Sequence, residues 1–493
     1  MAVPTDSIEL AQLDPSPAGS SSRPTSKVDP NSFISESSQT PCNSSIVSTD
    51  GIDNHLGFSS TGTEQAQLPP VDRGWAAWQF VIAATILEVQ IWGYAISYSV
   101  ILVHLETTEP WSRASLAALS SIGTIQLGLM FFLTVFINNA FRRYPDHARK
   151  ALYISAAVYP LSLLLSSFAT QVWQLIFAQG VVCGLSGAVL YGPVLLWIPE
   201  WFVERRGTAA GIVFSGTGLG GAVFPFVLGA LLDKVGFVWT VRVWSLVCAV
   251  AFSVSLYFIR PRIPPPRFAK GQPRPKWFLI NVKALNHPVN YVMIITTLVA
   301  SMAYFPVSLY LPIYASNLTG SNTFLPNVVA ACFNLVSFTA SMLIGYVSDK
   351  SLALTATTLG VVGGAVALGA WSTADSLVKV FIFAAVFGAT TPISSYWGAA
   401  TREIGGSDPY VSATLMASWG MVRGLASLFS PFLSSALYDP SEARWKSDSY
   451  GRFGFQDLII FVGVLSLVSS LGGVTFGVLK KTAGKRKGGT TPA

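Results

Sequence analysis

The sequence predicts an all-α membrane protein with twelve transmembrane helices arranged as two six-helix repeats. Only 11% of its 493 residues are charged, whereas soluble proteins carry roughly 25%. Twelve long apolar runs alternate with short polar loops, and the mean hydropathy is +0.51. A bilayer core about 30 Å thick takes about 20 apolar residues per span and offers the backbone no hydrogen-bond partners, so each run must form a helix.

The apolar runs set the expected domain boundaries. The first six lie at residues 75–105, 112–137, 151–168, 172–199, 207–232 and 238–259, and the second six at 289–315, 323–347, 353–371, 376–401, 410–437 and 457–479. We therefore predict two six-helix halves, at 72–259 and 289–479. The segment 260–288 has seven basic and no acidic residues, and we expect it to be a cytoplasmic linker.

Both ends of the chain are predicted to be cytoplasmic tails. Ser, Thr and Pro make up 29 of residues 1–71, which predicts disorder, and residues 480–493 form a short basic tail. If the N-terminus is inside, the inner loops and the C-terminal tail hold 20 Lys and Arg, and the outer loops hold 5. This asymmetry follows the positive-inside rule. No organelle address is readable, so we expect the plasma membrane.

Two glycosylation sequons test this orientation. Asn317 falls in a predicted outer loop and is expected to carry a glycan, whereas Asn43 falls in the predicted inner tail and is expected to be unmodified.

A segment at the end of the fifth span is repeated at the end of the eleventh. Residues 218–233 and 424–439 agree at seven of sixteen positions, among them Pro225 with Pro431. Corresponding helices in two halves indicate a parallel repeat, which places a substrate site near the bilayer midplane between the halves.

Two motifs resemble one branch of a known transporter family. The start of the first span, with Asp72, Gly74 and Trp75, resembles the first signature of the monocarboxylate porter branch of the major facilitator superfamily. Residues 201–211, with Arg205, Arg206 and Gly211, resemble its second signature. The resemblance covers residues 72–479, is closest to fungal members, and implies the major facilitator fold and secondary transport by rocking of the two halves.

Some positions depart from the family pattern. Members that move lactate-like acids with a proton carry a Lys late in helix one, but residues 94–99 contain none. They also carry an Asp and an Arg in helix eight, where Ser337 and Ser341 stand here. The superfamily loop motif is incomplete at 139–143 and survives after the eighth span as Gly345 and Asp349. Only the second half is expected to retain the charge clamp of the inner face.

Two ionisable residues within spans are the main candidates for substrate binding and coupling, because charge in the bilayer interior is unfavourable. Glu88 lies roughly 20 Å along the first span, where a buried carboxyl can exchange a proton; a structural hydrogen bond to a neighbouring helix is the alternative. Arg423 lies mid-span, and its guanidinium suits bidentate capture of a carboxylate. It can instead pair with Glu88 in one state of the cycle.

Aromatic and amide side chains are expected to complete the site. Trp92 shares the helix face of Glu88, and Tyr304, Asn334 and Trp419 are the best candidates to line a cavity for a ring-bearing substrate. Aromatic residues at span ends also serve as interfacial anchors. Lys379 and Arg242 lie near predicted outer ends, where snorkelling to the interface explains them.

Other functional classes have little support in the sequence. Residues 216–221 match the GxGxxG pattern, but no strand precedes them, so we expect close helix packing. There is no P-loop, so the chain has no ATP site of its own. We expect no enzyme activity, cofactor, metal or nucleic-acid partner. The four cysteines are far apart and are read as packing residues.

These observations predict a secondary transporter for a small organic anion or a fungal secondary metabolite. We expect coupling to protons through Glu88 and export rather than import. Uptake of a monocarboxylate or a vitamin is the alternative direction, and a non-transporting nutrient sensor that signals through residues 1–71 is the alternative from another class.

Overall fold

The helices of the computed structural model follow the predicted spans. The structure describes residues 68–266, 268, 272–275, 282–320, 324–439 and 450–488, and these residues form helices, turns and loops without a β-strand. The predicted disordered tail up to residue 67, with Asn43, and much of the predicted linker lie outside the described residues.

The first predicted half contains seven α-helices. They are α1 (Trp75–Ile96), α2 (Tyr98–Thr107), α3 (Leu116–Arg143), α4 (Pro145–Ser166), α5 (Val172–Leu175), α6 (Cys183–Trp201) and α7 (Arg206–Phe258), with a 3-10 turn η2 (Trp111–Arg113) and a π-helical segment η3 (Ile176–Val182). Only one residue, Ser97, lies between α1 and α2, so the two helices together form the first span.

The second half begins after the short helix α8 (Val282–Leu285). It consists of α9 (Pro288–Thr319), α10 (Phe324–Lys350), α11 (Leu352–Val366), η4 (Ala367–Trp371), α12 (Leu377–Thr390), η5 (Ile393–Tyr396), α13 (Trp397–Gly405), α14 (Pro409–Leu437), η7 (Arg452–Gly454) and α15 (Gln456–Gly488).

All twelve predicted spans are helical in the part of the chain that is described. Among the described residues, nine helical segments are long and apolar enough to cross a membrane. One of them, α7, has 53 residues and turns at Gly236 (φ 73°), so it contains both the fifth and the sixth predicted span. The third and eleventh predicted spans correspond to α4 and α14. The all-helical membrane fold is therefore confirmed.

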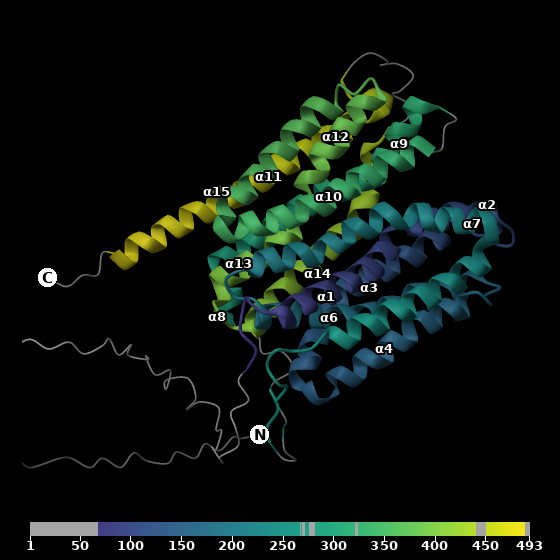
Figure 1. Cartoon of the computed structure of the whole chain (residues 1–493). Coiled ribbons are helices and arrows are strands. Elements are labelled where there is room, and N and C mark those ends of the chain that lie inside the picture. Colours follow the sequence, from purple (N-terminus) through teal and green to yellow (C-terminus); the bar gives the residue numbers. More distant parts are fainter. Residues whose placement is uncertain are drawn as a thin grey trace, which may run out of the picture. The chain divides into compact units, whose positions relative to one another are not determined.

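The helices contact one another in a repeated pattern. In the first half α7 packs on α1 and also on α10 of the second half; in the second half α14 packs on α9 and also on α3 of the first half. Figure 1 shows α7 and α10 side by side where the two groups of helices meet. The fifth and eleventh spans, which share the repeated segment, thus hold equivalent positions.

Glycines allow α7 to approach both neighbours closely. A Cβ placed on Gly220 would lie 2.5 Å from the Cα of Gly93 in α1, and one placed on Gly211 would lie 2.8 Å from the Cα of Gly345 in α10. Within the GxGxxG segment, Gly216 and Gly220 face α1, while Gly218 and Gly221 face α10. The predicted role of this segment in helix packing is confirmed.

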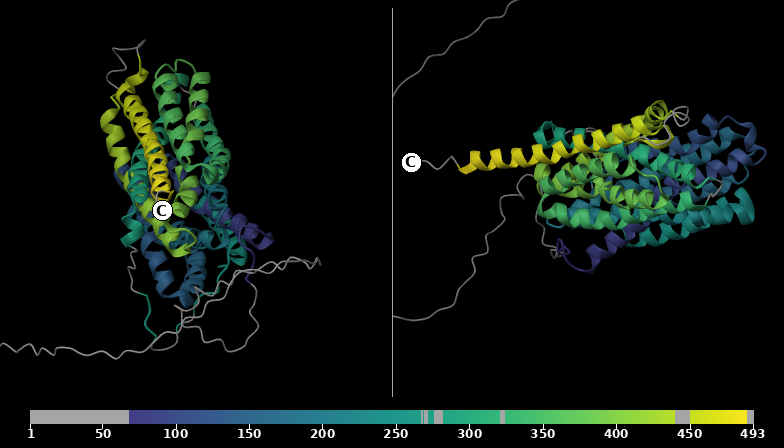
Figure 2. Two further views of the ribbon diagram at one scale, coloured as in Figure 1. Left: turned by 90° about the vertical axis from the view of Figure 1, so that its left-hand side faces the viewer. Right: turned by 90° about the horizontal axis from the view of Figure 1, so that it is seen from above.

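Two details refine the predicted boundaries. Helix α15 continues to Gly488, so the basic residues after 479 extend the last span as a helix, and in Figure 2 this helix projects beyond its neighbours. The cytoplasmic location of these residues stays a prediction. Asn317 is exposed, but it lies in the last turn of α9 instead of a loop. Its glycosylation stays a prediction.

The close approach of α1 and α7 predicts a difference between two glycines of the same helix. Gly220→Ala is expected to lower the free energy of unfolding by about 1–3 kcal/mol, the usual effect of overpacking. Gly229→Ala is the matched control, because its added Cβ meets only a side-chain methyl of Val100, at 3.7 Å. Thermal unfolding of the detergent-solubilised variants measures both. Equal melting temperatures would contradict the packing argument.

Candidate functional site

Glu88 lies at the point where α1 crosses α7. The residue is 3% exposed, and its Oε1 accepts a hydrogen bond from the Thr217 hydroxyl at 2.9 Å. Gly216 makes this position possible, since a Cβ there would lie 2.9 Å from the Cβ of Glu88. The second carboxyl oxygen, Oε2, is buried without a hydrogen-bond partner among the described residues. The predicted alternative, a structural hydrogen bond to a neighbouring helix, is therefore present, but it involves only one of the two carboxyl oxygens.

Arg423 lies in α14 against aromatic rings of α9. Its guanidinium carbon is 4.9 Å from the ring centre of Tyr304 and 5.5 Å from that of Phe305. Its Nη1 is buried and has no hydrogen-bond partner within the described part of the chain. A buried, unpartnered guanidinium nitrogen over two aromatic faces is an arrangement that can bind the carboxylate of a ring-bearing molecule.

Aromatic side chains connect these two charged residues. The Trp92 ring lies 4.4 Å from Phe131 and 5.2 Å from Tyr191, measured between centroids. Tyr191 is within electrostatic range of both Glu88 and Arg423. The Nε1 of Trp92 is a third buried polar atom with no partner in the described residues. We call the group Glu88, Trp92, Tyr191, Tyr304 and Arg423 the central cluster.

Glu88 and Arg423 do not form an ion pair here. The described ion pairs with both atoms within 4.0 Å join residues outside the central cluster. Pairing of these two residues in another state of the cycle stays a prediction.

Two predicted site residues have structural partners instead. Trp419 is fully buried and its Nε1 donates to Asn290 Oδ1 at 2.9 Å, which ties α14 to the first turn of α9. Asn334 donates its amide to the carbonyl oxygens of Gly221 and Ala330, at 3.3 and 3.0 Å. Both side chains hold helices together, and the structure does not place them with Glu88. The sequence could not distinguish these roles because both occur within spans.

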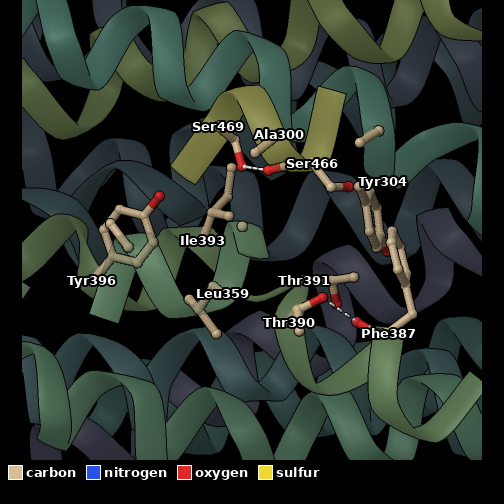
Figure 3. A pocket seen from close by; sticks show the side chains of 13 residues that line it. Ala300, Tyr304, Leu359, Phe387, Thr390, Thr391, Ile393, Tyr396, Ser466 and Ser469 are labelled. Atoms are coloured by element: carbon tan, nitrogen blue, oxygen red, sulfur yellow. Dashed lines mark hydrogen bonds between the residues drawn. The ribbon is translucent and has the colours of Figure 1, made fainter. Parts of the chain in front are cut away.

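A cavity of about 30 Å³ lies next to the central cluster in the second half. Figure 3 shows Tyr304 and Tyr396 at its two ends, with the hydroxyl residues Ser466, Ser469, Thr390 and Thr391 between them. These serines and threonines donate to main-chain oxygens three or four residues earlier, for example Ser469 Oγ to Ser466 O and Thr390 Oγ1 to Phe387 O, both at 2.7 Å. The cavity has room for water but not for a metabolite.

The predicted inner ends of α7 and α10 are joined by a carboxylate. Asp349 accepts hydrogen bonds from the backbone nitrogens of Gly207 and Thr208 at 2.8 and 2.7 Å, and from the Thr208 hydroxyl at 2.7 Å. A negative charge on the first turn of a helix is stabilised by the helix dipole. Asp349 of one half thus caps a helix of the other. Gly345 and Gly211 make room for this contact.

Arginines extend this connection between the halves. Arg206, fully buried, donates to Ser412 Oγ at 2.8 Å and to Gly406 O at 3.3 Å. Arg402 donates to Glu204 O at 2.6 Å and to Asp349 O at 3.0 Å. We call the contacts of Asp349, Arg206 and Arg402 the inner clamp. It closes one end of the molecule below the central cluster.

The two signature motifs meet at the same end. The carboxylate of Asp72 accepts hydrogen bonds from the backbone nitrogens of residues 203, 204 and 205 at 2.9–3.2 Å, so it holds the loop before α7. Gly74 adopts φ 89°, which suits glycine, and the exposed Trp75 begins α1. Arg205, also exposed, precedes the first turn of α7.

These features define a class of protein: a multi-pass membrane transporter whose two groups of helices enclose a polar centre. The chain belongs to the Major Facilitator Superfamily, whose sequence profile matches residues 80–431. Membership confirms the predicted twelve-helix fold and the prediction of a transporter rather than an enzyme.

The chain is also similar to named fungal transporters. The MFS transporter asaE of Aspergillus flavus is 24% identical over 331 residues, which are 67% of this chain and 73% of asaE. The MFS-type transporter pynF of Aspergillus niger is 27% identical over 284 residues, 57% of this chain and 63% of pynF. The MFS-type transporter pytF of Aspergillus terreus is 27% identical over 289 residues, 58% of this chain and 94% of pytF.

Several residues of the site escaped the sequence analysis. Thr217 and Phe131 have ordinary neighbours in the sequence and gain their position only from helix contacts. Arg206 lies one residue before the predicted fifth span at 207–232, so the sequence assigns it only to a motif and does not show that it is buried at the start of α7.

The inner clamp predicts a change in local protection. Asp349→Asn removes the charge and one acceptor, so the amides of Gly207 and Thr208 are expected to exchange hydrogen about tenfold faster or more, consistent with the 1.5–3 kcal/mol of hydrogen bonds to charged groups. Hydrogen exchange with mass spectrometry measures this. Lys350→Gln is the control, because Lys350 lies over the Tyr346 ring at 4.4 Å. Equal exchange in wild type and Asp349→Asn would contradict the role of the clamp.

Proposed function

We propose that this chain exports a small organic anion, such as a ring-bearing fungal metabolite, in exchange for protons. Arg423 binds the anion and Glu88 carries the proton. One observation supports the proposal above all: three buried polar atoms of the central cluster, Glu88 Oε2, Trp92 Nε1 and Arg423 Nη1, lack a partner among the described residues. Buried polar groups are otherwise satisfied in nearly all proteins, so these atoms indicate a ligand or water site.

The partners of Arg423 favour an anion with an aromatic or other flat body. Tyr304 and Phe305 lie against the guanidinium, and Trp92 and Tyr191, whose ring centres are 5.2 Å apart, are the other aromatic residues of the central cluster. The carboxylate of a substrate can accept a hydrogen bond from Arg423 Nη1 while a ring of the same substrate packs against the aromatic side chains. A rigid body gains from this arrangement more than a lactate-sized acid does, because it contacts more of the rings.

The surroundings of Glu88 suit proton exchange. Thr217 satisfies one carboxyl oxygen, and the other is free to hold the proton. In apolar surroundings the carboxyl group favours its neutral form until an approaching cation or water stabilises the charge. Movement of Arg423 toward Glu88 supplies such a cation.

The chain departs from lactate-type members at the residues that would relay their proton. Ser341 donates to Gly211 O at 3.0 Å and shares a hydrogen bond with Ser395, and Ser337 pairs with Thr391. These hydroxyls pack helices, so the proposed proton site is Glu88. The signature residues Asp72 and Arg205 nonetheless support a place near the monocarboxylate porter branch, and we propose the plasma membrane as its location.

A first experiment tests the role of Glu88. Untargeted mass spectrometry compares intracellular and extracellular metabolites in cells that express wild type, Glu88→Gln or no transporter, and the compound identified is then followed in proteoliposomes. Glu88→Gln is expected to abolish the pH dependence of flux and to lower proton-driven accumulation at least about tenfold, which corresponds to 1.4 kcal/mol of coupling. Thr217→Val, which keeps the carboxylate, is expected to retain pH dependence.

Three results would each reject a part of the proposal. Full pH-dependent flux in Glu88→Gln would show that the proton is carried elsewhere. No change in any metabolite ratio in wild type would favour the sensor alternative, and accumulation inside the cell would favour uptake.

A second experiment tests Arg423 with the same compound. Arg423→Gln is expected to raise the KM for the anion at least about tenfold, since loss of one partner of a buried charged hydrogen bond has effects of 2–5 kcal/mol. Arg423→Lys is expected to restore only part of the affinity, because Lys lacks the planar fork. Lys379→Gln is the control: Lys379 is exposed and pairs with Asp375 at 2.8 Å. An unchanged KM in Arg423→Gln would remove Arg423 from the binding site.

A further inference from the structure

A groove on the surface of the first half lies apart from the central cluster. It has a volume of about 480 Å³ and runs between α4 and the segment formed by α5 and η3. Its walls are apolar side chains that are 51% to 65% exposed, namely Leu161, Leu165, Phe168, Trp173 and Phe177. In a membrane-spanning helix pair such a surface faces lipid, and a groove of this kind fits an acyl chain.

The serines that line the groove form hydrogen bonds within the protein. Ser162 Oγ donates to Ala178 O at 2.7 Å, and Gln179 Nε2 donates to Ser166 Oγ at 2.8 Å. These bonds join α4 to η3 and satisfy the hydroxyl groups that line the groove. The groove is therefore apolar along most of its length. The exception is Gln174, whose Oε1 accepts hydrogen bonds from Thr170 N at 2.7 Å and Gln171 N at 3.1 Å.

A cation lies at one end of the groove. Arg242 of α7 donates its Nε to Ser167 Oγ at 3.0 Å, and its guanidinium carbon is 4.9 Å from the ring centre of Phe168, a groove residue, and 5.0 Å from that of Trp239. Among the described residues no carboxylate lies within ion-pair distance of Arg242, and neither of its NH2 groups is enclosed. The guanidinium thus keeps free donors beside an apolar channel.

We propose that this groove binds one phospholipid, with an acyl chain between α4 and η3 and the phosphate on Arg242. The two features are complementary to the two parts of this lipid, and an Arg fork matches phosphate geometry. Exposed Trp173 and Trp239 lie beside it, as aromatic residues do at the membrane interface. In the predicted orientation this is the outer leaflet. A sterol could also fill the apolar groove, but it has no phosphate and its binding would not depend on Arg242.

Native mass spectrometry of the delipidated full chain in detergent tests the proposal by titration with dioleoylphosphatidylglycerol. Arg242→Gln is expected to weaken the binding of the first lipid about tenfold, and Arg242→Lys is expected to weaken it less. Ala178→Phe fills the groove and is expected to weaken lipid binding at least as much as Arg242→Gln. Lys379→Gln, a cation that is already paired with Asp375, is expected to bind like wild type. Thermal unfolding shows that each variant is folded.

Four outcomes would overturn the proposal. Wild-type affinity in both Arg242→Gln and Ala178→Phe would show that lipid binds elsewhere. Loss of affinity in Ala178→Phe alone, with cholesterol competing for the site, would identify a sterol. If Lys379→Gln lost as much lipid affinity as Arg242→Gln, the lipid would be held by the general positive charge of the surface and not by this groove. If the protein bound inorganic phosphate as strongly as it binds the lipid, the site would be a simple anion site and not a phospholipid site.

Discussion

The candidate site depends on the close packing of α7 against two helices, α1 and α10. Lipid provides no hydrophobic drive between helices, so their association relies on close packing and on polar contacts. Glycines on one face of α7 admit α1, and glycines on the other admit α10 of the second half. A side chain larger than hydrogen at Gly216 would collide with Glu88. The same packing that holds the halves together therefore positions the buried carboxyl group.

Asp349 of the inner clamp and Glu88 of the central cluster differ in how completely their carboxyl oxygens are satisfied. Asp349 uses both carboxyl oxygens on the first turn of α7, whereas Glu88 leaves one oxygen without a partner. A satisfied carboxylate stabilises one arrangement of the halves; an unsatisfied one is stabilised by a ligand or by a proton. This difference separates a carboxylate that is fully used in the contact between the halves from one that keeps an acceptor without a partner.

The sequence predicted the spans well because lipid permits only helices that satisfy their own backbone. It also identified Glu88 and Arg423, since charged residues within spans stand out by composition alone. It could not separate Trp92, which joins the central cluster, from Trp419, which is bonded to Asn290, because the facing helix decides each role. Thr217 was missed for the same reason. Periodicity places a residue on a face of its own helix, but the identity of the neighbour comes from the fold.

Opening of the inner end must separate α7 from α10 while α1 stays with α7. The hydrogen bonds that join Asp349 to Gly207, Arg206 to Ser412 and Arg402 to Glu204 cross between the halves, so they break together when the halves rock. The contact of Glu88 with Thr217 lies within the first half and survives that motion. Arg423 belongs to the other half and moves relative to Glu88. Any rocking motion therefore changes the distance between these two charges. In the proposed function, that change links the protonation of Glu88 to the side on which the anion is bound.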